Sequence, residues 1–120
     1  MYDTNNIFAK ILRGEIPCKK VAEGEHFLSF YDINPKAKIH VLVIPKGHYV
    51  NAHDFAQKAR PEEMVGFWRG LDETIEILKL QDTGYRLVIN TGNHGRQEVP
   101  HLHAHILGGN DLGTKMVNRI

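Results

Sequence analysis

Three histidines near the end of the chain alternate with apolar residues: His101, His103 and His105 with Leu102, Ala104 and Ile106. Alternate side chains of a β-strand point to the same side, so a strand here would place the three imidazoles in one row, about 6.6 Å apart from one to the next. The apolar residues would then face a hydrophobic core. Gly108-Gly109 follows directly and predicts that this strand ends in an open turn.

The remaining hydrophobic patterns predict four more strands and two helices in one domain. Asn6 is expected to cap a short helix, and Pro61 followed by two glutamates is expected to begin a long one. The predicted helices span Ile7–Arg13 and Pro61 to about Leu80, and the strands span Lys19–Glu23, His26–Asp32, His40–Ile44, Tyr85–Thr91 and His101–Gly108. The first three strands follow one another closely, which favours antiparallel pairing. We therefore expect an α+β fold: a five-stranded, largely antiparallel sheet with one short and one long helix against it.

Charge and cysteine content exclude several classes of function. Fifteen Lys and Arg balance fourteen Asp and Glu, and a net charge of +1 argues against nucleic acid or a membrane surface as the main partner. Cys18 is the single cysteine, so neither an internal disulfide nor a zinc site built of several thiolates can form. The longest apolar run, Val41–Ile44, is far too short to span a bilayer, and the polar start does not have the form of a signal peptide. We expect a cytoplasmic protein.

The histidine row allows three interpretations. It can be a solvent-facing strand that happens to carry histidines, or a tetrahedral zinc site with His40 or His94 as a further ligand. It can also be a site where a neutral imidazole attacks phosphorus while neighbouring imidazoles assist. The loop from Gly92 to Pro100 contains flexible glycines, a guanidinium and an amide directly before the row, and such a loop can hold a phosphate. The loop therefore favours phosphate chemistry.

These residues also resemble a known family. The stretch His101 to Leu107 is similar to the HxHxHxx signature of the histidine-triad (HIT) superfamily. Other segments resemble motifs of its Hint branch in the same order along the chain: residues 7–17, Phe30–Pro35, His40–Lys46, Gly84–Asn90 and Gly95–Val99. The resemblance covers about residues 6–109 of one domain spanning 1–120, and leaves 110–120 as a C-terminal tail.

The resemblance implies a purine nucleoside phosphoramidase, which cleaves a P–N bond and releases AMP or GMP and an amine without a cofactor or metal. Carried over by position, His103 is the nucleophile that forms a nucleotidyl-histidine. The His101 backbone orients the His103 ring, His40 lies buried behind it, and His105 contacts the phosphate or the leaving group.

The resemblance also implies the nucleotide contacts and the assembly. Phosphate oxygens are assigned to Asn90, Gln97 and the Val99 backbone, and the ribose hydroxyls to Asp32. The base is expected between the apolar side chains of Ile7, Phe8, Ile11, Phe30 and Ile33. Family members are homodimers in which two sheets join and the long helices pack together.

Two positions depart from the family pattern. Glu98 stands where many members have a small hydroxyl residue that helps protonate the leaving amine. Asn110 to Ile120 also lacks the tryptophan-and-proline ending of the animal branch. Two rival functions therefore remain: a nucleotide-binding module that acts through partner proteins with residual activity, and a zinc-binding protein.

Overall fold

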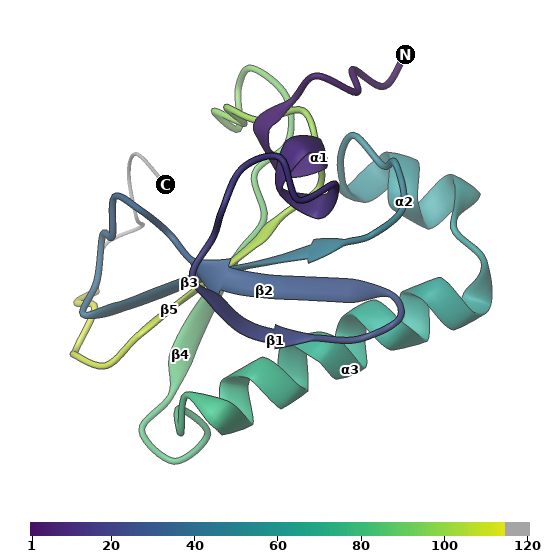
Figure 1. Cartoon of the computed structure of the whole chain (residues 1–120). Coiled ribbons are helices and arrows are strands. Elements are labelled where there is room, and N and C mark those ends of the chain that lie inside the picture. The colour runs from purple at the N-terminus through teal and green to yellow at the C-terminus, as the bar shows by residue number, and fades with distance from the viewer. Residues whose placement is uncertain (115–120) are drawn as a thin grey trace.

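A single five-stranded antiparallel sheet forms the centre of the molecule (Figure 1). The computed structural model describes residues 1–114. The strands lie in the order β1-β2-β3-β5-β4 and span Lys20–Glu23, Phe27–Tyr31, Ile39–Pro45, Ala104–Gly108 and Tyr85–Val88, in that order across the sheet. Every neighbouring pair is antiparallel, so the predicted fold class is confirmed.

Helices cover both faces of this sheet (Figure 1). The long helix α3, Pro61–Ile77, packs on one face against β1, β2 and β3. The short helix α1, Ile7–Leu12, lies on the opposite face, where Phe8 joins Phe30 and Leu42 in a second hydrophobic cluster. Because both faces are covered, β3 is buried along almost its whole length, and its residues from Val41 to Pro45 form an apolar run.

A third helix, α2 at Ala52–Lys58, was not predicted from the sequence. It is short and contributes one buried side chain, Phe55, so its hydrophobic periodicity is weak. Its one clear signal is the N-cap, because the Asn51 side chain accepts a hydrogen bond from the Asp54 backbone N–H.

The helix and strand ends differ from the predictions by a few residues. Helix α3 ends at Ile77 rather than near Leu80, because Lys79 adopts a left-handed backbone with φ of 58°. Strand β4 ends at Val88, and β5 begins only at Ala104. His101 and His103 therefore lie in the extended segment that leads into β5, and not within a regular strand.

The close approach of α3 to the sheet depends on its glycines. A Cβ atom at Gly70 would collide with the ring of Phe27 on β2, and one at Gly66 would lie 2.8 Å from the Cβ of His26. Within residues 1–114, no helix is both long and apolar enough to cross a membrane. Residues 115–120 of the predicted C-terminal tail lie outside the described part of the chain.

Candidate active site

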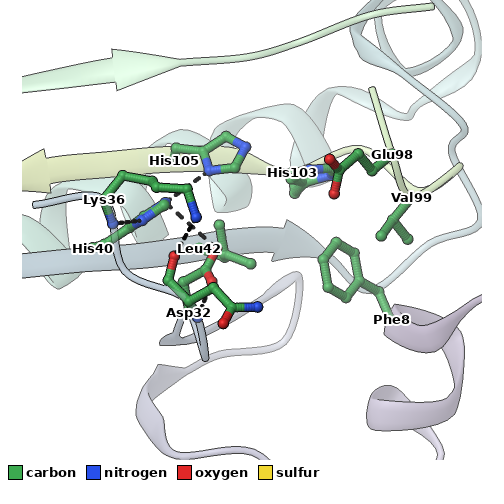
Figure 2. A pocket seen from close by; sticks show the side chains of 10 residues that line it. Phe8, Asp32, Lys36, His40, Leu42, Glu98, Val99, His103 and His105 are labelled. Atoms are coloured by element: carbon green, nitrogen blue, oxygen red, sulfur yellow. Dashed lines mark hydrogen bonds and ion pairs between the residues drawn. The ribbon is translucent and has the colours of Figure 1, made fainter. Parts of the chain in front are cut away.

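The histidines gather on the face of the sheet that carries α1. Leu102, Ala104 and Ile106 belong to the core on the opposite face, beneath α3, as the alternation predicted. His103 and His105 face a pocket between the sheet, α1 and two loops (Figure 2). Its lining consists of Phe8, Asp32, Asn34, Lys36, His40, Leu42, Glu98, Val99, His103 and His105. All three histidines of the row are buried, which excludes the interpretation as a solvent-facing strand.

The tautomer of His103 follows from one hydrogen bond. Its Nδ1 lies 2.7 Å from the backbone carbonyl oxygen of His101, and a carbonyl can only accept. Nδ1 therefore carries the hydrogen, which leaves the lone pair on Nε2. Burial lowers the pKa of His103, whereas the Asp32 and Glu98 carboxylates act in the opposite direction. The ring is thus a neutral imidazole at pH 7.

His40 and His105 form a second, directional pair. The backbone N–H of Lys36 donates to His40 Nδ1 at 3.0 Å, so the hydrogen of His40 is on Nε2. His40 Nε2 lies 2.9 Å from His105 Nδ1, which must accept and leaves the hydrogen of His105 on its own Nε2. That Nε2 is buried and has no hydrogen-bond partner within residues 1–114. His105 therefore presents an unused donor at the pocket.

Burial keeps this pair uncharged. Burial, together with smaller contributions from the adjacent His103 and His40 imidazoles, lowers the pKa of His105 to about 3. Burial also lowers the pKa of His40, against the opposing effect of the Asp32 carboxylate. Because both rings are neutral, each carries one ring hydrogen, and the Lys36 backbone N–H fixes which nitrogen carries it.

His101 lies behind the pocket and is not among its lining residues. Its ring is fully buried, and its Nε2 donates to the Pro45 carbonyl oxygen at 2.9 Å. Burial lowers the pKa of His101 to about 4. The hydroxyl of Tyr2 lies 2.5 Å from its other nitrogen, Nδ1. His101 is thus held at both nitrogens, and its carbonyl in turn orients His103.

Two carboxylates flank the histidines. Asp32 Oδ1 accepts the Asn34 N–H in a turn, while its Oδ2 lies 3.5 Å from His40 Nε2. Glu98 lines the pocket beside His103 (Figure 2). Among residues 1–114, Asp32, His40 and His105 bring ligand-type atoms within 4.8 Å of one another, a geometry that can hold a metal ion. This set differs from the zinc site considered above, because it omits His101, His103 and the exposed His94.

The structure places one of the three residues expected to hold phosphate at the pocket. Val99 lines the pocket, whereas Asn90 and Gln97 do not. The Gln97 amide donates to the carbonyls of Val50 and Val99 and accepts from the Gly92 N–H. In this arrangement Gln97 holds the loop before the histidine row together, and its predicted phosphate contact would require these bonds to rearrange.

The expected base-binding side chains divide between core and surface. Phe8 lies edge-on to the His103 ring, with centroids 4.9 Å apart, and packs on the buried Phe30. Ile11 packs on the same cluster, and Ile7 is partly exposed. Ile33 is 87% exposed at the turn after β2, beyond the pocket lining. Phe8 is thus the one of these five that the structure places directly beside His103.

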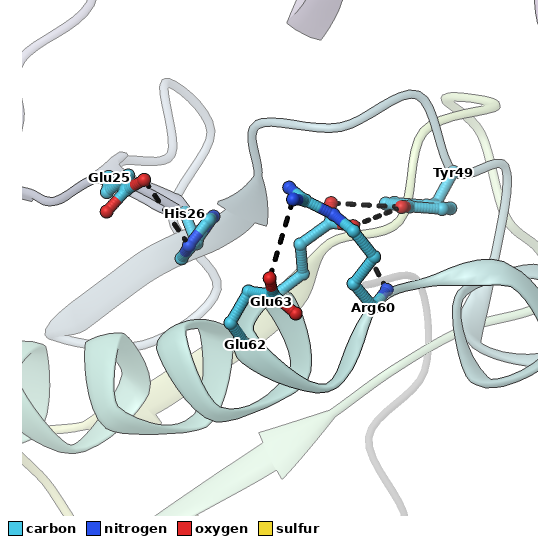
Figure 3. Close-up of polar contacts among 6 residues, drawn as sticks. All are labelled: Glu25, His26, Tyr49, Arg60, Glu62 and Glu63. Atoms are coloured by element: carbon cyan, nitrogen blue, oxygen red, sulfur yellow. Dashed lines mark hydrogen bonds and ion pairs between the residues drawn. The ribbon is translucent and has the colours of Figure 1, made fainter.

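The N-terminus of α3 supports the histidine segment through Tyr49 (Figure 3). The Tyr49 hydroxyl donates to the Glu63 carboxylate at 2.9 Å, and Glu63 also accepts the Arg60 backbone N–H. The Tyr49 carbonyl in turn accepts the N–H of Leu102, which stands between His101 and His103. The helix that covers one face therefore helps to fix the histidines on the other.

Sequence reasoning missed three participants: Tyr2, the Lys36 backbone and Leu42. Leu42 pairs with His105 across β3 and β5. Tyr2 and Leu42 act through residues far away in the sequence, whereas the Lys36 N–H acts on His40, four residues away, which in turn contacts the distant His105. A possible signal for Leu42 was its place two residues after His40, on the same face of a strand.

Comparison with known proteins identifies the family. The model of the HIT domain matches residues 13–112. A HIT-like protein of Azospirillum brasilense is 53% identical over 112 residues, covering 93% of this chain and 92% of its own. The purine nucleoside phosphoramidase of Escherichia coli is 37% identical over 116 residues, 94% of each chain. The solved structure of a histidine triad protein from Clostridium difficile superposes with a TM-score of 0.83 at 38% identity, covering 97% of this chain and 100% of that one. The chain belongs to the HIT domain family.

Proposed function

We propose that this protein is a purine nucleoside phosphoramidase that releases AMP or GMP and an amine through a nucleotidyl-histidine. One observation carries the proposal: the hydrogen bond from His103 Nδ1 to the His101 carbonyl leaves the Nε2 lone pair of a neutral imidazole available in the pocket. A neutral imidazole is a competent nucleophile toward phosphorus. The similarity to the phosphoramidase of Escherichia coli supports the same chemistry.

The reaction divides into two displacements at phosphorus. His103 Nε2 attacks the α-phosphorus, the P–N bond breaks, and the amine leaves with its bonding electron pair and a proton. We assign this proton to Glu98, which lines the pocket beside His103 and becomes a carboxylate when it gives the proton up. Water then attacks the nucleotidyl-histidine and passes its proton to that carboxylate, which releases the nucleoside monophosphate and restores both His103 and Glu98.

The unused donor of His105 supports a phosphate site. A buried N–H without a partner costs about 1–3 kcal/mol, and an oxygen of a bound phosphate would satisfy it. The same hydrogen bond stabilises negative charge that develops on that oxygen during attack. Asp32, which also lines the pocket, has an acceptor suited to a ribose hydroxyl, and Asn90, Gln97 and the Val99 backbone remain the proposed phosphate contacts.

We also propose that two copies of the chain form a homodimer through β4 and α3. Strand β4 is an edge of the sheet, and its Tyr85 and Leu87 side chains are exposed. On α3, Trp68 and Val65 are more than half exposed. An uncovered apolar edge and helix face of this kind are typical of an interface between chains.

The decisive experiment is a steady-state assay with a fluorogenic adenosine 5′-phosphoramidate. We expect turnover by the wild type with and without EDTA, and loss of turnover in His103→Ala with nucleotide affinity within about tenfold, because the variant removes a nucleophile and little binding surface. The matched control is His53→Ala, which removes an exposed imidazole on α2 and is expected to remain fully active.

Other outcomes would favour the rival functions. An inactive wild type that still binds AMP would indicate a nucleotide-binding module that works through partners. Turnover lost on chelation and restored by zinc would indicate a metal function at Asp32, His40 and His105. An active His103→Ala variant would eliminate the nucleotidyl-histidine mechanism.

A further inference from the structure

The second residue of the chain contacts the first histidine of the row. The Tyr2 hydroxyl lies 2.5 Å from His101 Nδ1, although the two residues are 99 positions apart in sequence. The Tyr2 ring also stacks on His48, with centroids 4.3 Å apart and planes inclined by 6°. These contacts place Tyr2 against the back of the histidine row, outside the pocket lining.

The direction of this hydrogen bond is fixed by the surroundings of His101. His101 Nε2 faces the Pro45 carbonyl, which can only accept, so Nε2 carries the hydrogen. Because the buried ring is neutral, Nδ1 has a lone pair and must accept. The Tyr2 hydroxyl is therefore the donor, and it satisfies a nitrogen that is fully removed from solvent.

A turn before α1 holds Tyr2 in this place. The backbone N–H of Asn6 and its side-chain amide both donate to the Asp3 carbonyl, at 3.2 and 2.7 Å. The Asn6 side-chain oxygen also accepts from the Ala9 N–H and caps α1. The helix whose Phe8 contacts His103 therefore also positions the residue that contacts His101.

We propose that Tyr2 is a positioning residue for the histidine row. Its hydroxyl holds the His101 ring, and with it the backbone segment whose carbonyl oxygen accepts the His103 Nδ1 hydrogen. Tyr2 thereby sets the direction of the His103 Nε2 lone pair without touching the substrate. The kinetic part of this role rests on the phosphoramidase function proposed above, whereas its structural part does not.

The test compares Tyr2→Phe with the wild type, because phenylalanine keeps the ring that stacks on His48 and removes only the hydroxyl. Long-range proton–nitrogen correlation spectra report the imidazole nitrogens directly. We expect the His101 Nδ1 signal to move downfield on loss of its donor, and the His103 Nδ1–H signal to move with it. We expect kcat to fall about tenfold with KM within about twofold, since the variant changes the orientation of the His103 Nε2 lone pair and leaves the binding pocket unchanged.

Tyr31→Phe is the matched control, because it also removes one tyrosine hydroxyl, from β2, and should change neither histidine signal. Unmoved His101 or His103 signals in Tyr2→Phe, or an unchanged kcat, would overturn the proposal. A general loss of folding would reveal itself as a lower melting temperature and an equal change at all histidines, which would also count against it. If the wild type cleaves no phosphoramidate, the proposed function fails, and the two histidine signals still decide whether Tyr2 positions the row.

Discussion

The His101 carbonyl oxygen accepts the Nδ1 hydrogen of His103 at 2.7 Å, and this bond assigns the lone pair of His103 to Nε2. The proposed nucleophile is therefore oriented by a backbone carbonyl two residues away. Its ability to attack phosphorus depends on pH, because only the neutral ring keeps this lone pair.

The pH dependence of turnover follows from the burial of His103. Its pKa is lowered from the ordinary value of about 6.5, and only the neutral ring can attack phosphorus. We expect the acid limb of the kcat/KM profile, on which the neutral His103 is lost, to have an apparent pKa below 6.5. The measurement is a kcat/KM profile from pH 4.5 to 8, with His53→Ala showing the same profile. An acid limb centred above pH 6.5 would contradict the neutral-nucleophile model.

The free energy of unfolding is also expected to depend on pH. The pKa values of His101 and His105 are about 4 and about 3 in the folded state, below the ordinary value reached on unfolding. Stability is therefore complete above pH 6.5 and is lost as the pH falls, because the unfolded chain binds protons that the folded chain does not. Each of the two groups contributes a slope of about 1 kcal/mol per pH unit. Urea unfolding at pH 7.5, 6.5 and 5.5 measures this, and equal stability at all three values would refute it.

Glu98 can be tested through the basicity of the leaving group. A donated proton assists a basic alkylamine more than a weakly basic arylamine, because only the alkylamine needs protonation as it leaves. We expect Glu98→Gln to slow an alkylamine phosphoramidate roughly 10- to 100-fold and an arylamine analogue only slightly. Parallel kcat measurements on the two substrates provide the comparison. Equal slowing of both would assign Glu98 to binding or positioning.

Gly70 is expected to be sensitive to a single added methyl group. The Cβ of Gly70→Ala would collide with the Phe27 ring, so α3 must move away from the sheet or the ring must leave its place. We expect a loss of about 1–3 kcal/mol in the free energy of unfolding, as is usual for overpacking. Urea denaturation measures it, with the exposed Glu73→Ala on the same helix as control. A variant as stable as the wild type would show that the Phe27 ring or α3 moves aside at little cost in free energy.

The proposed dimer makes a prediction about mass. The wild type should elute at about 27 kDa by light scattering, twice the 13.7 kDa of one chain. Trp68→Lys combined with Leu87→Lys places two charges on the exposed apolar surfaces and should shift the mass to one chain. A monomeric wild type would exclude the interface, and a variant that stays dimeric would place it elsewhere.

The sequence by itself determined the class of fold and the face on which each histidine lies. Alternation in the row assigned Leu102, Ala104 and Ile106 to the core, because side-chain direction in extended chain has a period of two. Local periodicity likewise located α1 and α3. It could not locate α2, whose single buried side chain gives no periodic signal.

Only the tertiary structure decided how the histidines are held. The tautomer of His105 depends on a backbone N–H at Lys36, and that of His101 on the Pro45 carbonyl and the Tyr2 hydroxyl. These partners come from three separate segments, and hydrogen bonds between distant segments leave no spacing that a sequence pattern can reveal. The depressed pKa values have the same origin, since burial under α1 and the loops exists only once the chain has folded.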